Sequence, residues 1–383
     1  MKRPIHISLG PNYENDDVLL ALKTLFNPLK WQDTSETEKL EREFEEMFPG
    51  YQALAVNSGR SAEYLILKTL GVGKRDEVIY QTFTCVAVPN SASWLGAKPV
   101  GVDMGSDYNI DEKDLQKKLT KKTKAIIQQN TFGIPANIKK LRVPIIDDQA
   151  HSLGIGKTGE IAFFSFGRDK IISSVFGGMI IVSDSELFVK LKALRDKLKN
   201  PPLLWTLQQL LHPIAMFVIL PTYSVGLGKL ILFALQKINL LSRAVYPEEK
   251  KGGQPNVFPS KMPVALAALA RHQLKKLERF NLHRKKIAKY YFENLKFHFE
   301  NLNEDAIVLP PNIKEAVYLR FPLRVKNARG LLKFAKNKGV ILGDWYNEID
   351  ADVVNLPTYP NLTLKDAQTV VSVIKQWLRT KAN

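Results

Sequence analysis

The stretch from Val143 to Lys170 constrains the fold of this chain more than any other. It contains two apolar runs, Val143–Ile146 and Ile161–Phe166, each bounded by turn residues. Short runs of this kind, rich in Ile, Val and Phe, are typical of strands buried on both faces. The two runs therefore predict neighbouring buried strands in a sheet that is covered by helices on both sides.

Polar side chains lie at or just after the ends of both runs. Asp147 and Asp148 follow the first run, with His151 close behind, and the second run carries Ser165 and leads to Lys170. In open α/β sheets, ligands bind at the carboxyl ends of the strands. An acid, an imidazole and a lysine at one sheet edge suit a cofactor that needs a partner for a ring nitrogen and an amine for a Schiff base.

Further short apolar runs alternate with helical stretches such as Asp111–Leu119. Strands that alternate with helices predict an α/β fold with a mostly parallel sheet. A helix is also expected over Glu36–Met47, with Ser35 as the capping candidate. The additional strands are predicted at Gln52–Val56, Val78–Tyr80, Pro99–Val102, Ala125–Gln128 and Met179–Val182.

The turn after the first of these strands, Asn57–Ser61, opens a predicted helix. Backbone N–H groups at the start of a helix can hold a phosphate. A plain connection between strand and helix, with a polar cap, explains the same residues equally well.

Composition narrows the class of protein. The chain has 383 residues, 45% hydrophobic and 24% charged, which indicates a folded protein of more than one domain. A single cysteine excludes a disulfide framework, and we expect no metal site. The net charge of +17 favours anionic partners, but no nucleic-acid-binding pattern is present. The first residues carry no apolar signal segment, so we expect a cytoplasmic protein.

Residues 200–247 interrupt the α/β pattern and are predicted to form a separate apolar helical insertion between domains 1–199 and 248–383. Pro213 and Pro221 are expected to subdivide it, leaving no apolar run long enough to span a bilayer. Two interpretations remain, helices lying in a membrane interface or helices buried against the body or a second subunit.

The C-terminal part is expected to be a smaller α+β domain. A long helical region begins near Pro263, a strand is predicted over Val317–Val325, and two further helices are predicted over Arg329–Lys338 and Leu364–Trp377.

Five motifs occur in order along the chain. They are NSGRSA at residues 57–62, FTCVAVPNSASWLGAKPVGVD at 83–103, IIDDQAHSLG at 145–154, FFSFGRDK at 163–170 and LPTYPNLT at 356–363. Together they resemble the motifs of the DegT/DnrJ/EryC1/StrS family of sugar aminotransferases. The resemblance implies pyridoxal 5'-phosphate as cofactor and the aspartate aminotransferase-type (type I) fold, with a seven-stranded, mostly parallel sheet and a smaller C-terminal domain.

The resemblance also assigns roles to residues. It implies that Lys170 is the catalytic lysine that holds the cofactor covalently and moves protons. Asp148 would face the pyridine nitrogen, and Asp147 would point the other way along its strand. His151 would contact the phenolic oxygen, and Ser165 would bind the phosphate.

Several positions depart from the family pattern. The backbone of Gly59, Arg60 and Ser61 would close round the phosphate, but Arg60 replaces a threonine, so either its guanidinium or the Ser61 hydroxyl would take over. Cys85 stands where an aromatic residue usually covers the ring. The segment through which a neighbouring subunit reaches the phosphate aligns with residues 259–261, so Lys261 could act across a dimer.

The expected function is the transfer of an amino group from glutamate to a nucleotide-linked keto-sugar. The product would serve in the synthesis of a surface polysaccharide or a related glycan. The expected partners are these small molecules, a second copy of the chain and a peripheral membrane contact, with no nucleic acid. A lipid-linked substrate would fit better if the insertion touches membrane. One alternative is a sugar dehydratase of the same fold, in which histidine replaces the lysine. Another is a non-catalytic scaffold that docks on membrane.

Overall fold

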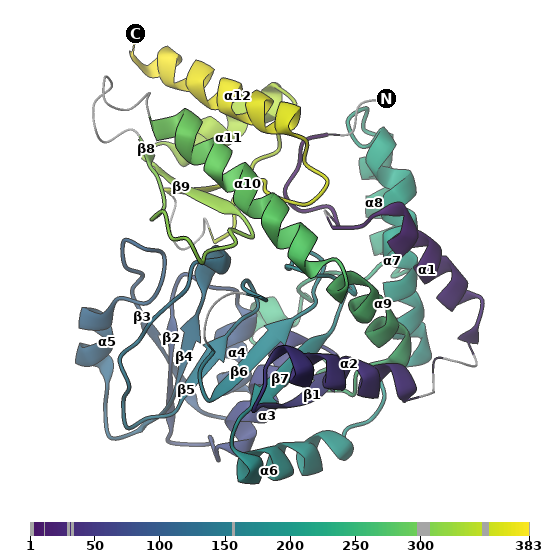
Figure 1. The fold of residues 1–383 in the computed structure, drawn as a ribbon, viewed down its shortest axis with the longest axis vertical. Helices are drawn as coiled ribbons and strands as arrows, with labels where there is room; N and C mark the ends of the chain where they lie inside the picture. The colour runs from purple at the N-terminus through teal and green to yellow at the C-terminus, as the bar shows by residue number, and fades with distance from the viewer. Residues whose placement is uncertain are drawn as a thin grey trace.

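In the computed structural model, a seven-stranded sheet forms the centre of the larger part of the molecule (Figure 1). The model describes residues 4–10, 12–28, 31, 34–154, 158–296, 307–346 and 352–382. In spatial order the sheet consists of β1 (Gln52–Val56), β7 (Gly178–Val182), β6 (Ile161–Ser165), β5 (Ile145–Asp148), β4 (Thr123–Gln129), β2 (Glu77–Gln81) and β3 (Lys98–Val102).

Strand direction confirms the predicted fold class. Neighbouring strands from β6 to β3 are parallel, whereas β7 runs antiparallel to both β6 and β1. Both predicted bounds of the first apolar run were wrong, because β5 begins at Ile145 rather than Val143 and includes both aspartates. The end of the second run was also wrong, because β6 ends at Ser165 rather than Phe166. Asp147 and Asp148 pair in register with Gln128 and Gln129 of β4, so the ladder holds them in extended conformation.

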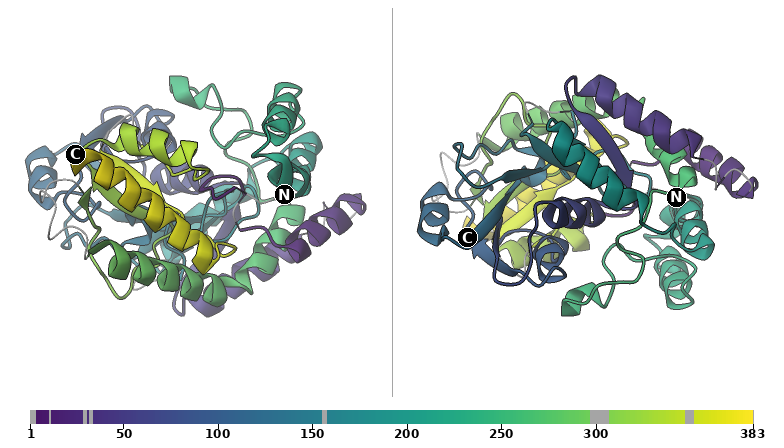
Figure 2. Two further views of the ribbon diagram at one scale, coloured as in Figure 1. Left: turned by 90° about the horizontal axis from the view of Figure 1, so that it is seen from above. Right: turned by 90° about the horizontal axis from the view of Figure 1, so that it is seen from below.

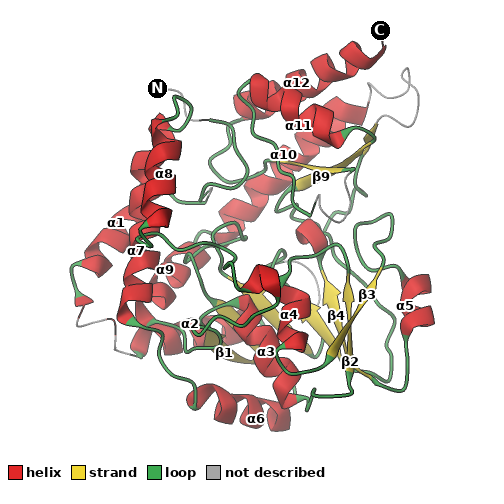
Figure 3. Cartoon of the chain, turned by 180° about the vertical axis from the view of Figure 1, so that it is seen from behind, coloured by secondary structure: helices red, strands yellow, loops and turns green. Residues whose placement is uncertain are grey.

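Helices cover both faces of the sheet, as the apolar strands predicted. The helices α3 (Gly59–Thr69), α4 (Ala87–Ser93) and α6 (Ser185–Asp196) pack on one face, which Figure 3 shows towards the viewer. On the other face lie α2 (Ser35–Met47) and α9 (Val264–Leu274). Alternate strand residues divide between the two apolar cores, as the two-residue period of a strand requires.

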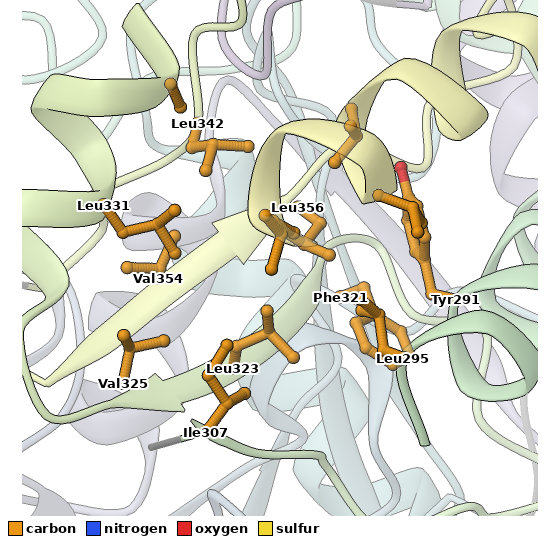
Figure 4. Close-up of a cluster of buried hydrophobic side chains, with 14 of the residues drawn as sticks. Tyr291, Leu295, Ile307, Phe321, Leu323, Val325, Leu331, Leu342, Val354 and Leu356 are labelled. Atoms are coloured by element: carbon orange, nitrogen blue, oxygen red, sulfur yellow. The ribbon is translucent and has the colours of Figure 1, made fainter. Parts of the chain in front are cut away.

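The C-terminal part is built on a three-stranded antiparallel sheet in the order β10-β9-β8. Figure 4 shows its core, where Phe321, Leu323 and Leu356 lie near Tyr291. The predicted strand over Val317–Val325 is shorter than expected, because Tyr318 has a positive φ of 47°. The elements are α10 (Leu277–Lys296), β8 (Ile307–Val308), β9 (Phe321–Val325), α11 (Ala328–Asn337), β10 (Val353–Leu356) and α12 (Leu364–Ala382).

The remaining elements are α1 (Asn15–Leu25), α5 (Glu112–Lys118), the 3-10 turns η2 (Thr131–Gly133) and η3 (Glu249–Lys251), and the two helices of the insertion. The insertion consists of α7 (Leu203–Thr222) and α8 (Leu227–Lys237), which lie together at one edge of the molecule beside α1 (Figures 1 and 2). The expectation that Pro213 and Pro221 leave no apolar run long enough to span a bilayer was wrong. Both prolines lie inside α7, which is an unbroken apolar helix of 20 residues.

The three-part division at residues 200 and 248 stays a prediction. The first described residues depart from this division, because they pack with the C-terminal part. Ile5 forms a parallel bridge with Val340 and is buried in the C-terminal core.

Candidate functional site

The predicted site residues gather at one edge of the central sheet. Asp148 and Ser165 are the last residues of the parallel strands β5 and β6. β1 ends at the same edge and leads directly through Ser58 into α3. The common direction of these strands therefore brings together residues that are far apart in the sequence.

Asp148 is buried, with 3% of its surface exposed. Burial raises the pKa of its carboxyl to about 6, while the backbone N–H of Ala150 and the charge of Lys170 act in the opposite direction. The Ala150 N–H donates to Oδ1 at 2.9 Å. An acid in this setting keeps a negative charge near neutral pH only at a free-energy cost, and a cationic group placed beside it would relieve that cost.

Asp147 faces a different environment, as expected for its neighbour along a strand. Its Oδ1 accepts a hydrogen bond from Asn130 Nδ2 at 2.7 Å, and its Oδ2 accepts one from Gln149 Nε2 at 2.7 Å. Thr158 Oγ1 and the backbone N–H of Gly159 donate to Oδ2 at 3.3 Å. These donors tie β4, β5 and the approach to β6 together, so Asp147 supports the structure around the site.

His151 lies flat against Phe132, with ring centroids 6.0 Å apart and an interplanar angle of 6°. Its Nδ1 accepts a hydrogen bond from the backbone N–H of Phe132 at 3.2 Å. Burial holds the pKa of this imidazole well below its usual 6.5, and the charges of Lys170 and Arg320 lower it further. A neutral ring whose Nδ1 accepts must carry its hydrogen on Nε2, which leaves Nε2 as a donor.

Lys170 lies in the loop after β6 and is half-buried. Burial lowers the pKa of its amine, and the nearby Asp148 and Cys85 oppose this shift. The side chain of Asn12 holds the loop by donating to the Lys170 carbonyl at 2.5 Å. Nζ lies 5.7 Å from the ring centroid of Trp345. The amine therefore loses its proton more readily than a solvated lysine does.

The backbone at the start of α3 approaches the strand ends closely. A Cβ on Gly59 would lie 2.9 Å from the Cβ of Ser165, and one on Gly178 would lie 2.5 Å from the carbonyl carbon of Ser58. Ser58 caps the helix, because its Oγ accepts the N–H of Ser61 at 3.2 Å. Only glycine at position 59 leaves the first turn of the helix against Ser165, a cradle of the kind that holds phosphate.

The two polar candidates in that turn point elsewhere. The guanidinium of Arg60 pairs with buried Glu249 and donates to the carbonyl of Ala244 at 2.9 Å. The Ser61 hydroxyl donates to Asn57 Oδ1 at 2.7 Å. Both side chains are bonded elsewhere, and the N–H of Ser61 donates to Ser58, so the turn offers the backbone N–H groups of Gly59 and Arg60.

Cys85 lies half-buried just before α4, close enough to Lys170 and Tyr346 for an anion at its position to raise the pKa of both. It therefore belongs to the cluster.

Lys261 forms an antiparallel backbone bridge with Val56 at the end of β1, beside the turn that opens α3. Its backbone N–H donates to the Lys199 carbonyl at 3.0 Å, and its residue lines a surface cavity of about 490 Å³ with Glu38 and Arg195. None of the residues that line this cavity belongs to the cluster around Lys170.

The C-terminal part supplies three residues that sequence reasoning missed. Arg320 is 2% exposed, its Nη2 donates to Ser8 Oγ at 3.0 Å, and it lies 3.7 Å from Asp169. Its Cζ stacks 3.0 Å above the centroid of Trp345, and burial lowers its pKa to about 9. Its buried Nη1 has no partner among the described residues.

Trp345 and its neighbour Tyr346 bring aromatic rings to the site. Trp345 lies 5.6 Å from the His151 ring, and Tyr346 lies 5.0 Å from the Phe83 ring. Their loop has no periodic pattern, so the sequence carried no signal for them.

Glu63, on α3, was also missed. It is 1% exposed, and burial raises its pKa well above the usual value, with further increases from Asp148 and Cys85. A signal did exist for this residue, since it interrupts the apolar side of α3 between Ala62 and Leu65.

Comparison with known proteins gives a consistent result. The model of the DegT/DnrJ/EryC1/StrS aminotransferase family matches residues 13–200 and 248–349 and leaves out the insertion. GDP-perosamine synthase of Caulobacter vibrioides is 34% identical over 178 residues, which cover 42% of this chain and 48% of that protein. The chain thus matches about half the length of this relative. An uncharacterized protein of Methanocaldococcus jannaschii is 28% identical over 87% of this chain and 88% of its own length.

Solved structures support the fold. PseC of Helicobacter pylori, an aminotransferase involved in the biosynthesis of pseudoaminic acid, has a TM-score of 0.69 at 18% identity, covering 99% of this chain and 100% of its own. The aminotransferase from Psychrobacter cryohalolentis has a TM-score of 0.72 at 18% identity, with coverage of 97% and 99%. At this identity, the likeness concerns the fold alone.

Proposed function

Because the chain belongs to the DegT/DnrJ/EryC1/StrS aminotransferase family, we propose that it is a pyridoxal-phosphate-dependent aminotransferase acting on a keto-sugar. The observation that carries this proposal is the half-buried amine of Lys170, with its lowered pKa, in one cluster with the buried acid Asp148. A lone surface lysine would have neither property.

The cluster fits the cofactor. Asp148 suits a protonated ring nitrogen, because a cation there would stabilise the buried carboxylate. The Nε2–H of His151 suits an anionic ring oxygen. Ser165 and the backbone N–H groups of Gly59 and Arg60 suit the phosphate, whereas the N–H of Ser61 is taken up by the Ser58 cap. Cys85 would lie near the ring in place of an aromatic cover. When bound, pyridoxal phosphate supplies an electron sink for the carbon that loses its proton.

Lys170 carries the chemistry of the chain itself. Its lowered pKa increases the fraction of neutral amine, which is the form able to bind a carbonyl carbon. As a free base, the same amine would move a proton between the α-carbon of the amino donor and the aldehyde carbon of the cofactor. Burial of the surrounding residues keeps water from competing for that proton.

The proposed donor is glutamate, and the proposed acceptor is a nucleotide-linked keto-sugar used in the synthesis of a surface polysaccharide or glycan. GDP-perosamine synthases among the relatives support a nucleotide-linked acceptor. Arg320, buried and with an unpartnered Nη1, suits a carboxylate of the donor.

We also propose a homodimer in which Lys261 reaches the phosphate of the neighbouring subunit. The protein would lie in the cytoplasm and contact membrane through residues 200–247, the segment between the domains 1–199 and 248–383.

Visible absorbance of the full-length protein with added cofactor, followed by borohydride reduction and peptide mapping, tests the proposal. We expect a coloured protein that glutamate bleaches, with the reduced adduct on Lys170. K170A should lose both the colour and the adduct, whereas K139A, which changes an exposed lysine, should keep them. A colourless wild type, or an adduct elsewhere, would contradict the assignment. An acceptor product that has lost water without gaining nitrogen would favour a dehydratase.

A further inference from the structure

The insertion exposes an unusual amount of apolar surface. Of the eighteen large apolar residues found exposed in the described part of the chain, ten lie between Leu203 and Leu240. We call the exposed apolar surface at the C-terminal end of α7 and on α8 the outer face of α7 and α8, and define it by Phe217, Val218, Leu230 and Phe233, which are 46–65% exposed. Large apolar side chains exposed together on two helices that pack on each other mark an interaction site.

The opposite side of α7 is fixed to the protein. Trp205 and Met216 are buried there, together with the polar Gln209, and α7 packs against α1 and α9. The helix has 20 residues and a mean hydropathy of 1.6, so by length and composition it could cross a bilayer. Its packing against the protein, however, favours a helix that lies along a surface and exposes one side.

The charges carried by the insertion itself have one sign. No Asp or Glu occurs between Lys197 and Pro247. Lys229, Lys237 and Arg243 are all exposed. Lys237 lies beside exposed Ile238, where a long side chain can keep its ammonium at the headgroup level while its stem stays among apolar groups. An anionic surface would therefore attract this face, and a neutral apolar partner would not explain the charges.

The insertion is also joined firmly to the candidate active site. Gln209 of α7 accepts from Ser242 Oγ at 2.5 Å, and Arg168, two residues before Lys170, donates to the same Ser242 Oγ at 2.5 Å. Arg60, at the start of α3, donates to the Ala244 carbonyl. A partner bound to the outer face would consequently be held at a set position relative to the site.

We propose that the outer face of α7 and α8 docks on an anionic lipid bilayer and so holds the aminotransferase site at the membrane surface. This inference deepens the membrane contact proposed above for residues 200–247, and the location of the chemistry rests on the proposed aminotransferase function. Apolar side chains enter the boundary between headgroups and acyl chains, and the basic residues contact anionic headgroups.

Sedimentation of the full-length protein with vesicles of phosphatidylcholine, with and without phosphatidylglycerol, tests the proposal. We expect binding to the anionic vesicles that weakens as salt is raised. L230E/F233E should lower the bound fraction at least about tenfold, because two large apolar side chains are replaced by anions. V189E/L282E is the matched control, since Val189 and Leu282 are 65% and 60% exposed on α6 and α10, and it should bind as the wild type does.

Two further measurements separate the possible outcomes. L230E/F233E should keep the visible absorbance of bound cofactor and its bleaching by glutamate, so loss of vesicle binding can be distinguished from loss of the active site or of the fold. Failure of the wild type to sediment with anionic vesicles would overturn the proposal. So would a change from dimer to monomer in L230E/F233E with vesicle binding unchanged, which would show that a second copy covers this face.

Discussion

Replacing Asp148 by asparagine should stabilise the protein in the absence of cofactor. Burial raises the pKa of this carboxyl to about 6 from an ordinary 3.8. At 1.36 kcal/mol per pH unit, the ionised form therefore opposes folding by about 3 kcal/mol above pH 7. Asparagine keeps an oxygen for the Ala150 N–H, which donates at 2.9 Å, and removes the buried charge. D148N should thus gain up to about 3 kcal/mol at pH 8.

The pH dependence has a definite sign. Between pH 3.8 and 6 the folded protein holds a proton on Asp148 that the unfolded chain has lost, so the contribution of Asp148 to stability falls as pH rises through this window and is constant above it. The advantage of D148N should therefore shrink to about 1.5 kcal/mol at pH 5. Urea unfolding at pH 5 and pH 8 measures both values.

D147N is the matched control. Asp147 accepts hydrogen bonds from Asn130 and Gln149, so an amide there would set one N–H group against a donor. The expected effect is a loss of about 2 kcal/mol at both pH values. If D148N is no more stable than wild type at pH 8, or if its gain in stability is the same at pH 5, burial does not determine the pKa of the Asp148 carboxyl.

Two other predictions concern the cofactor and the donor. G59A places a Cβ 2.9 Å from the Cβ of Ser165, so we expect weaker binding of pyridoxal phosphate in a fluorescence titration. The control is G73A, whose added Cβ meets nothing within 4 Å and which should bind the cofactor as the wild type does. Equal affinities of G59A and wild type would contradict the assignment of this turn to the phosphate. R320Q should raise the KM for glutamate about tenfold, in keeping with loss of a charge-assisted hydrogen bond, while the absorbance of bound cofactor persists; an unchanged KM would remove Arg320 from donor binding.

The sheet could be predicted from the sequence because its strands are short apolar runs with clear ends. Val78–Tyr80 lies within β2, and Gln52–Val56 coincides with β1. The residues at which a strand begins and ends were harder to predict. The expected run Val143–Ile146 starts at a residue that precedes Pro144, and the actual strand continues through two charged residues that pairing with β4 keeps extended.

Local patterns could not predict where long side chains go. Arg60 was considered for phosphate binding, but its partner Glu249 lies 189 residues away, beyond an insertion whose path the sequence does not reveal. Trp345 and Arg320 reach the site only because the C-terminal part packs over the sheet edge. The prediction from Pro213 was wrong because the low helix propensity of proline describes an isolated helix, whereas packing against α1 stabilises α7.

The insertion leaves the body and returns to it at almost one point. Trp205 Nε1 donates to Tyr246 Oη at 2.8 Å, although 41 residues separate them. The backbone N–H of Lys261 likewise donates to the Lys199 carbonyl at 3.0 Å. A segment closed at its base in this way can be gained or lost by a gene in a single event without moving the strands that carry Asp148 and Ser165. The insertion and the active site can therefore have different evolutionary histories. Homologues with and without the insertion can share one ancestral active site.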